Sequence, residues 1–158
     1  MIPCLSVRQP WASLIVHGIK PIENRMWSCV LRKRIAIHAS KTWGRDEKDA
    51  FDMLLQIAID HGDTRRQDIL YMSRNLLGGF VGSAHLRDCI GEREWYAKGG
   101  GKFDGWTSWF VGPIGWYFTG ARPFDVFVPY RGQRGLFNIP AADLPEMPVE
   151  EARRGCRN

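Results

Sequence analysis

The sequence has few of the features that mark membrane or exported proteins. It contains no apolar run of about 18 residues, so no membrane-spanning helix and no membrane partner are predicted. A secretory signal layout is also missing, because Arg8 interrupts the N-terminus and the short apolar run 11–16 ends at His17-Gly18. We therefore expect a cytoplasmic protein.

Cysteine is equally sparse, and its spacing argues against metal. The chain has four cysteines with no Cys-x-x-Cys pair, so structural zinc is not expected and reduced thiols are. The cysteines are Cys4, Cys29, Cys89 and Cys156. No metal site and no cofactor are predicted.

The common catalytic signatures are missing too. No Gly-x-Ser-x-Gly, paired-histidine or Cys/His pattern occurs. The glycine-rich segment Lys98–Lys102 resembles a phosphate loop, but Phe103 stands where serine or threonine is required. Two interpretations of this segment stay open, a flexible basic lid over nucleic acid and a loop without function.

What the chain does have is positive charge and tryptophan. Its net charge is +5 and its pI is about 9.2, which favours a polyanionic partner. Seven tryptophans occur in 158 residues, several of them near arginine or lysine. Aromatic planes beside cations suit unpaired bases on a phosphate backbone. The alternative is that most of the tryptophans fill a small core.

Hydrophobic periodicity predicts an α+β protein with its helices concentrated in the first half. About six or seven short strands separated by glycine and proline turns favour a closed or partly closed barrel. The expected strands are 4–7, 22–27, 35–39, 80–89, 109–119, 124–129 and 135–139. Helices are expected from Pro10 to Gly18, from 46 to 62 and, opened by a capping box at Thr64, from 64 to 75. Residues 91–105 are predicted to be a loop with a helical turn at 92–97.

The densest polar cluster lies between Ser6 and Arg25. A helix of about two turns reverses the chain within roughly 15 Å, so its two ends can flank one cleft. In the strand that follows, Glu23 and Arg25 share one face because side chains alternate along a strand. The sequence therefore predicts that Lys20, Glu23 and Arg25 line one cleft with Arg8 or Gln9 nearby.

These residues resemble a known family. The pattern Gly18-x-Lys20-x-x-Glu23-x-Arg25, preceded by the segment 5–12 with Gln-Pro-Trp, is similar to the ASCH (activating signal cointegrator homology) domain. The similarity continues through residues 37–41, 81–82, 115–117 and 135–138, and so covers about residues 2–140. It implies an ASCH domain at 1–140 with an extension at 141–158. It also implies a PUA-like β-barrel of about six strands flanked by helices, and RNA-related binding in a charged cleft.

Some members of the family resemble amidohydrolases that act on N4-acetylcytidine. Their pattern places threonine three residues after the motif lysine, where this chain has Glu23. A nucleophilic lysine must be partly deprotonated, whereas a neighbouring carboxylate favours its charged form. We therefore interpret Lys20 as a clamp for phosphate or carbonyl rather than a nucleophile, and Glu23 as a general base if burial raises its pKa.

The first hypothesis for function is a nucleic-acid-binding module, with RNA as the preferred partner. The alternative is a hydrolase of RNA or of a modified nucleoside, either a ribonuclease or an amidohydrolase, with Lys20 and Glu23 catalytic. A second alternative is a protein-interaction domain. The expected nucleic-acid contacts are Arg8, Gln9, Trp11, Lys20, Arg25, His38, Ser40 and Lys41. For each of them a structural role remains the alternative, such as an ion pair between Glu23 and Arg25 or a hydrogen-bonded core position for His38.

Overall fold

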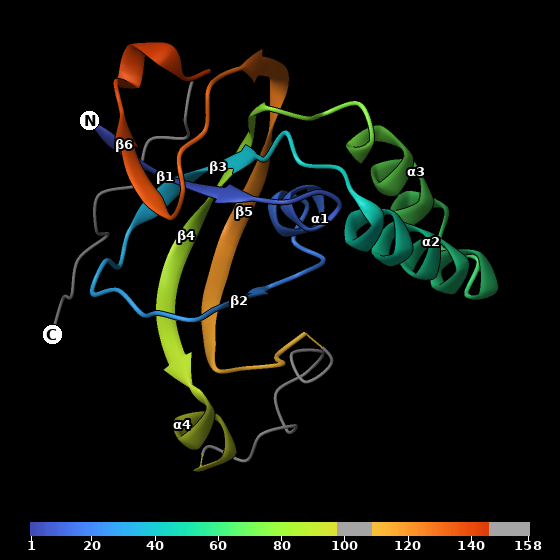
Figure 1. The fold of residues 1–158 in the computed structure, drawn as a ribbon, viewed down its shortest axis with the longest axis horizontal. Helices are drawn as coiled ribbons and strands as arrows, with labels where there is room; N and C mark the ends of the chain where they lie inside the picture. The colour runs from blue at the N-terminus through green and yellow to red at the C-terminus, as the bar shows by residue number, and fades with distance from the viewer. Residues whose placement is uncertain (98–108, 146–158) are drawn as a thin grey trace, which may run out of the picture.

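A single mixed sheet organises the protein, and its strands follow the spatial order β2-β5-β4-β3-β1-β6 (Figure 1). The computed structural model describes residues 1–97 and 109–145. Its strands are β1 (Ile2–Val7), β2 (Ile22–Arg25), β3 (Arg34–Ala39), β4 (Gly79–Gly91), β5 (Ile114–Pro129) and β6 (Leu136–Ile139). Strands β1 and β3 run parallel, and the other neighbouring pairs are antiparallel.

The prediction of a barrel is wrong in one respect, because the sheet does not close. A barrel requires its two edge strands to pair with each other. Within the described residues, β2 pairs with β5 and β6 pairs with β1, so that these two four-residue strands remain the edges. The α+β class is confirmed, with the predicted six strands arranged as an open, strongly curved sheet (Figure 1).

Strand β5 is one continuous element, although a turn was expected to divide it after residue 119. Gly120 adopts a left-handed φ of +54°, yet the chain continues in pairing with β4. The irregularity is absorbed by three register shifts between β4 and β5, since such bulges bend a strand and increase its twist without ending it. The long β4–β5 pair thus forms the spine of the sheet.

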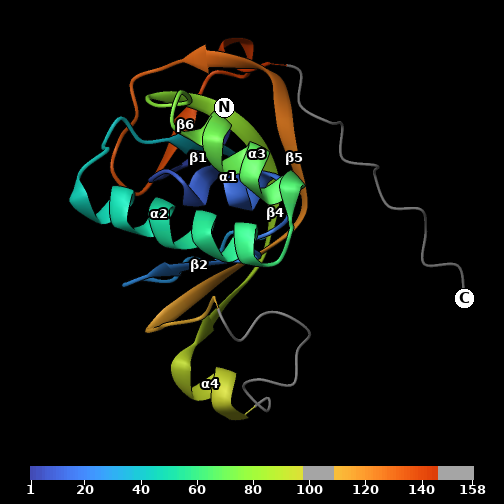
Figure 2. The ribbon, with the colours of Figure 1, turned by 90° about the vertical axis from the view of Figure 1, so that its right-hand side faces the viewer.

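The helical elements are α1 (Trp11–Val16), α2 (Arg45–Asp60), α3 (Thr64–Ser73), α4 (Glu92–Ala97) and the 3-10 turn η1 (Ala141–Asp143). Helix α1 packs on this sheet, α3 packs against α1, and α2 packs against α3. Helix α1 packs Ala12, Ile15 and Val16 into the core formed with β1, β3, β4 and β5. Leu14, from the same helix, joins a second cluster with the apolar faces of α2 and α3. Figure 2 shows α2 and α3 side by side beside α1.

The cap of α3 differs from the expectation. Asp63, rather than Thr64, is the N-cap, and its carboxylate accepts a hydrogen bond from Arg66 N at 2.8 Å. Thr64 is instead the first residue of the helix. The Asp63 carboxylate accepts a hydrogen bond from an otherwise free backbone amide and also interacts favourably with the helix dipole. Asp63 is therefore a stronger N-cap than Thr64, and the helix begins one residue earlier than expected.

In the described part of the chain, no helix is long and apolar enough to cross a membrane.

Candidate nucleic-acid interface

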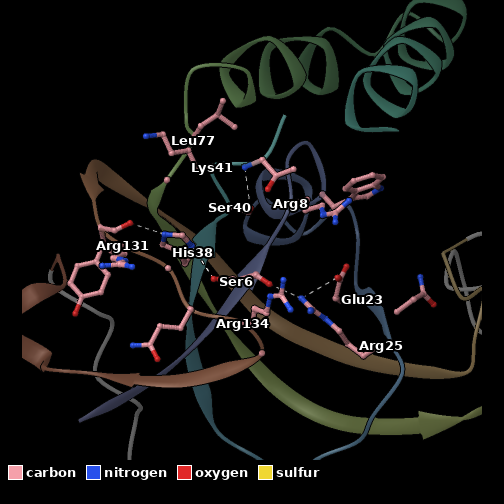
Figure 3. Close-up of a pocket in the computed structure, with 18 of the residues that line it drawn as sticks. Ser6, Arg8, Glu23, Arg25, His38, Ser40, Lys41, Leu77, Arg131 and Arg134 are labelled. Atoms are coloured by element: carbon pink, nitrogen blue, oxygen red, sulfur yellow. Dashed lines mark hydrogen bonds and ion pairs between the residues drawn. The ribbon is translucent and has the colours of Figure 1, made fainter. Parts of the chain in front are cut away.

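A cleft of about 1370 Å³ opens where β1 and β3 end beside β2 (Figure 3). The described residues that line it are Ser6, Arg8, Trp11, Lys20, Glu23, Asn24, Arg25, His38, Ser40, Lys41, Thr42, Leu77, Gly78, Val111, Pro129, Tyr130, Arg131, Gly132, Gln133, Arg134 and Gly135. Eight of these are residues that the sequence singled out. The cleft brings Lys20, Glu23 and Arg25 together with Arg8, as predicted.

Parallel pairing explains why segments 30 residues apart meet here. Since β1 and β3 are parallel, their carboxyl ends lie at the same edge of the sheet, with Ser6 opposite His38 in the register. The residues that follow each strand then reach the cleft, Arg8 from one side and Ser40 and Lys41 from the other. Strand ends of this kind present side chains that the sheet itself holds in place.

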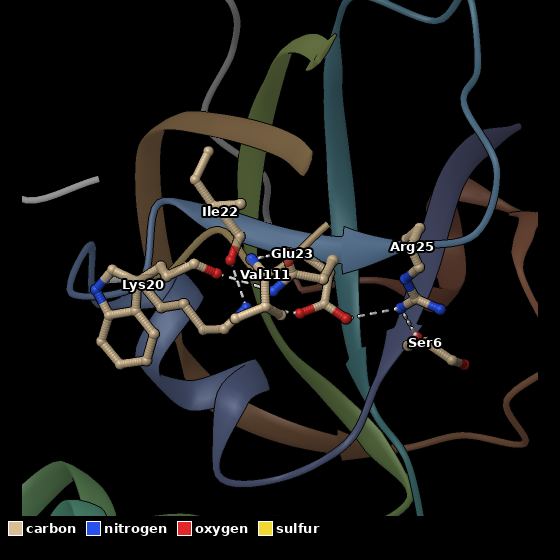
Figure 4. Close-up of polar contacts among 8 residues, drawn as sticks. Ser6, Lys20, Ile22, Glu23, Arg25 and Val111 are labelled. Atoms are coloured by element: carbon tan, nitrogen blue, oxygen red, sulfur yellow. Dashed lines mark hydrogen bonds and ion pairs between the residues drawn. The ribbon is translucent and has the colours of Figure 1, made fainter. Parts of the chain in front are cut away.

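Lys20 lies at the inner end of the cleft and forms a salt bridge with Glu23, which also pairs with Arg25 (Figure 4). Its Nζ donates to Ile22 O and lies 2.8 Å from Glu23 Oε2, while Arg25 Nη2 lies 3.3 Å from Glu23 Oε1. Arg25 Nη2 also donates to Ser6 O at 2.7 Å, which ties β2 to β1. Glu23 therefore holds two cations from opposite sides.

The pKa of Lys20 shifts in the direction opposite to the one that the neighbouring carboxylate alone suggested. Only 3% of the residue is exposed, and this burial lowers the pKa of Lys20 below its ordinary value. The Glu23 carboxylate opposes the shift, and Arg25 adds to it. The sequence placed the charged partners correctly but gave no information on desolvation, which is the larger effect.

Arg8 connects the cleft to the start of α2. Its Nη1 donates to Glu47 Oε1 at 2.8 Å, and Glu47 Oε2 accepts a hydrogen bond from Gly44 N at 2.7 Å. Burial alone raises the pKa of Glu47, but the hydrogen bonds from Gly44 and Arg8 outweigh it and hold the pKa below its usual value. The Glu47 carboxylate is therefore ionised and buried, whereas 57% of the Arg8 side chain remains exposed to the cleft.

His38 is hydrogen-bonded on both ring nitrogens. Nε2 lies 3.0 Å from Tyr130 O and Nδ1 lies 3.1 Å from Ser6 Oγ. A carbonyl oxygen can only accept, so Nε2 carries a hydrogen. Burial lowers the pKa of His38, which makes the ring neutral at pH 7 and leaves Nδ1 to accept from the Ser6 hydroxyl. This chain of hydrogen bonds connects β1, β3 and the segment that follows β5.

The segment 130–135, which joins β5 to β6, was missed as part of the site. It brings Tyr130, Arg131 and Arg134 to the cleft, where Tyr130 O is bonded to His38, 92 residues earlier in the chain. Gly132 makes this approach possible, because a Cβ there would lie 2.4 Å from His38 Cε1 and 2.9 Å from Ser6 Oγ. Two arginines in a short glycine-containing turn were the available signal, but no local pattern says which strand ends such a turn faces.

The positive charge in the cleft is only partly neutralised. Glu23 is the one acidic side chain among the described lining residues, and it already holds Lys20 and Arg25. Lys41, Arg131 and Arg134 have no hydrogen-bonding or ionic partner for their side chains within residues 1–97 and 109–145.

Gln9 does not line the cleft. It is fully buried, and its amide group bonds to Ser13 Oγ, Ser13 N and Leu76 O. These bonds tie the start of α1 to the segment after α3. Among the described tryptophans, Trp11 alone lines the cleft, while Trp95 and Trp116 are core residues. The lid proposed at Lys98–Lys102 lies outside the described residues.

No group of three or more histidine, cysteine, aspartate or glutamate side chains in the described ranges is placed to hold a metal ion.

Comparison with known proteins identifies the family. The sequence model of the ASCH domain matches residues 5–112, which include the end of β1, the whole of β2, β3 and β4, and the Lys20–Arg25 motif. The chain belongs to the ASCH domain family. Strands β5 and β6 lie beyond the matched stretch and pair with β4 and β1, respectively.

Relatives in sequence and structure agree with this assignment. The chain is 32% identical over 91 residues to human activating signal cointegrator 1, and 30% identical to the mouse protein over the same length. Each match covers 58% of this chain and 15% of the relative. The crystal structure of ASCH from Zymomonas mobilis has a TM-score of 0.50 at 15% identity, with 89% of both chains covered, and supports the fold alone.

Proposed function

We propose that this ASCH domain binds single-stranded RNA in the cleft described above, with residues 1–140 as the binding domain and 141–158 as an extension. The observation that carries the proposal is the unneutralised charge of Lys41, Arg131 and Arg134 around one opening. The three side chains are exposed, and a cluster of unneutralised cations around one cleft attracts an anionic ligand.

The cations of the cleft form an inner, paired group and an outer, exposed group, and this arrangement also favours RNA as the ligand. Lys20 and Arg25 are held by Glu23 at the inner end, while the outer ones are exposed and can each reach a phosphate. Arg8 is intermediate, because it is paired with Glu47 yet more than half exposed. A strand of linked phosphates along the outer cations would leave a base or sugar facing the inner cluster.

Two aromatic side chains line the same cleft. Trp11 and Tyr130 are both partly exposed there. Base–aromatic stacking contributes about 1–3 kcal/mol per base and tolerates many sequences. Together with phosphate contacts, such stacking favours unpaired nucleic acid over a duplex, whose bases are already stacked.

Fluorescence titration of a labelled single-stranded RNA over a range of salt concentrations tests the proposal. We expect a log–log salt slope of about −2 to −4, as for a domain that neutralises a few phosphates. Binding that ignores salt, or no binding at low salt, contradicts a nucleic-acid module and favours the protein-interaction alternative.

One observation favours a second candidate, a hydrolase of RNA or of a modified nucleoside such as N4-acetylcytidine. Burial lowers the pKa of Lys20, and a lowered pKa is what a lysine base or nucleophile needs. Against it, both polar contacts of Lys20 Nζ are already made within the protein. The test is a product assay on the metal-free protein, in which turnover lost in Lys20→Met promotes this candidate and no turnover by the wild type rejects it.

A further inference from the structure

Two cysteines far apart in sequence meet outside the lining of the proposed RNA cleft. Cys29 lies in the segment 26–33 that joins β2 to β3, and Cys89 lies near the end of β4. Their sulfur atoms are 3.9 Å apart, and both residues are partly exposed. Neither residue lines the cleft, so the pair is independent of the proposed RNA site.

The surroundings hold the two thiols together. Arg32 Nη1 donates to Cys29 O at 2.7 Å, and Arg32 Nη2 pairs with Asp88 at 2.9 Å. The same guanidinium reaches Cys89 Sγ at 3.9 Å. The segment and the strand are therefore already bridged by an exposed ion pair that is directly adjacent to the sulfurs.

We propose that Cys29 and Cys89 are a redox-active dithiol that oxidises reversibly to an intramolecular disulfide and ties the segment 26–33 to β4. A disulfide requires the sulfurs at about 2.05 Å, so they must approach further. Side-chain rotation and adjustment of a segment without regular structure can provide this movement.

The oxidant is a small-molecule disulfide such as oxidised glutathione. One cysteine loses its proton and attacks a glutathione sulfur, which breaks the glutathione S–S bond and releases one glutathione thiolate. The second cysteine loses its proton and attacks the mixed disulfide, which forms the Cys29–Cys89 bond and releases the second thiolate. Both thiolates take up the two protons, and the protein dithiol is oxidised while the glutathione disulfide is reduced.

Burial affects the rate of this exchange. It raises the pKa of the Cys89 thiol, and the nearby Arg32 guanidinium opposes that shift. Since the thiolate is the reacting form, the reaction is expected to quicken as the pH rises. Cys4 is a contrasting case, because it is fully buried and burial raises its pKa strongly.

The bond would restrain the segment that leads out of the edge strand β2. Trp27, in the same segment, accepts a hydrogen bond at its carbonyl oxygen from Trp116 Nε1 at 2.9 Å and packs edge-on against that ring. Oxidation would add a covalent connection to these contacts. We therefore expect slower backbone hydrogen exchange in residues 26–33 of the oxidised protein.

Equilibration of the full chain in glutathione buffers of graded composition tests the proposal, with alkylation and peptide mass mapping as the readout. The expected result is the loss of two alkylatable thiols and a Cys29–Cys89 cross-linked peptide, both reversed by excess reduced glutathione. Cys29→Ser and Cys89→Ser should each lose the cross-link completely and carry glutathione on the remaining cysteine.

Cys4→Ser and Cys156→Ser are the matched controls and should keep the Cys29–Cys89 cross-link. The proposal is overturned if the wild type, in the most oxidising buffer, keeps both thiols, carries only glutathione adducts or cross-links Cys156 instead. It is also overturned if the cross-link forms but hydrogen exchange in residues 26–33 stays unchanged. Because the mapping is done on the wild type, the result does not depend on whether a serine variant folds.

Discussion

Neutralising Arg131 and Arg134 tests whether the segment after β5 contacts phosphates. The double substitution Arg131→Gln/Arg134→Gln removes two of four exposed cations at the cleft, the others being Arg8 and Lys41. Neither arginine has a partner in the described part of the chain, so their loss leaves no buried charge unpaired. We expect the fold to remain intact and the binding to change.

The magnitude follows from counterion release. For single strands the log–log salt slope is about −0.7 per phosphate neutralised, which gives about −2.8 for four contacts and about −1.4 for two. Raising the salt from about 50 to about 200 mM should then weaken binding about 50-fold in the wild type and about sevenfold in the double variant. The two slopes differ enough to be measured by fluorescence anisotropy.

A control variant with the same net charge separates local contacts from overall charge. Lys33→Gln/Arg93→Gln removes two exposed cations that do not line the cleft. It should keep a slope near the wild-type value. If both double variants lower the slope equally, the positive charge acts over the whole surface, and the reasoning that places phosphates beside Arg131 and Arg134 is refuted.

Three further substitutions test the contacts that build the cleft. Lys20→Met should lower the free energy of unfolding in urea by about 1–3 kcal/mol, because a buried carbonyl loses its donor; an unchanged value contradicts the buried contact. Glu47→Gln should cost a similar amount at pH 7 by weakening the bond to Arg8. Folding lowers the pKa of Glu47, so the difference in unfolding free energy between wild type and variant should shrink as the pH falls below about 4.3. A difference that does not change with pH would contradict this expectation. Gly132→Ala should lower the free energy of unfolding by about 1–3 kcal/mol and weaken RNA binding, because the added methyl group would overlap His38. Wild-type values in both the urea titration and the RNA titration would contradict this close approach.

The local elements and the family could be predicted from sequence. Alternation alone placed Glu23 and Arg25 on one face of β2, and their side chains are indeed 3.3 Å apart. The short helix after Pro10 and its end near Gly18 could also be predicted, since both depend on the backbone preferences of nearby residues. The motif around Lys20, together with the upstream Gln-Pro-Trp segment and the later strands, indicated the ASCH family, which the comparison confirms.

Tertiary structure alone decided burial and long-range neighbours. The polar pattern around Gln9 predicted a ligand contact, but packing turns its amide inward to Ser13 and Leu76. Lys20 was predicted to keep its charge because of Glu23, whereas desolvation, which depends on everything packed around it, lowers its pKa.

Closure of the sheet and completion of the cleft were likewise non-local. Whether β2 and β6 meet depends on the curvature accumulated along β4 and β5, whose register shifts leave no clear mark in the sequence. Arg131 and Arg134 reach the ends of β1 and β3 because β6 pairs with β1 and so returns the chain to that edge. Sequence determines the local conformation of such segments, since that depends on adjacent residues, but only the folded chain brings distant segments to one surface.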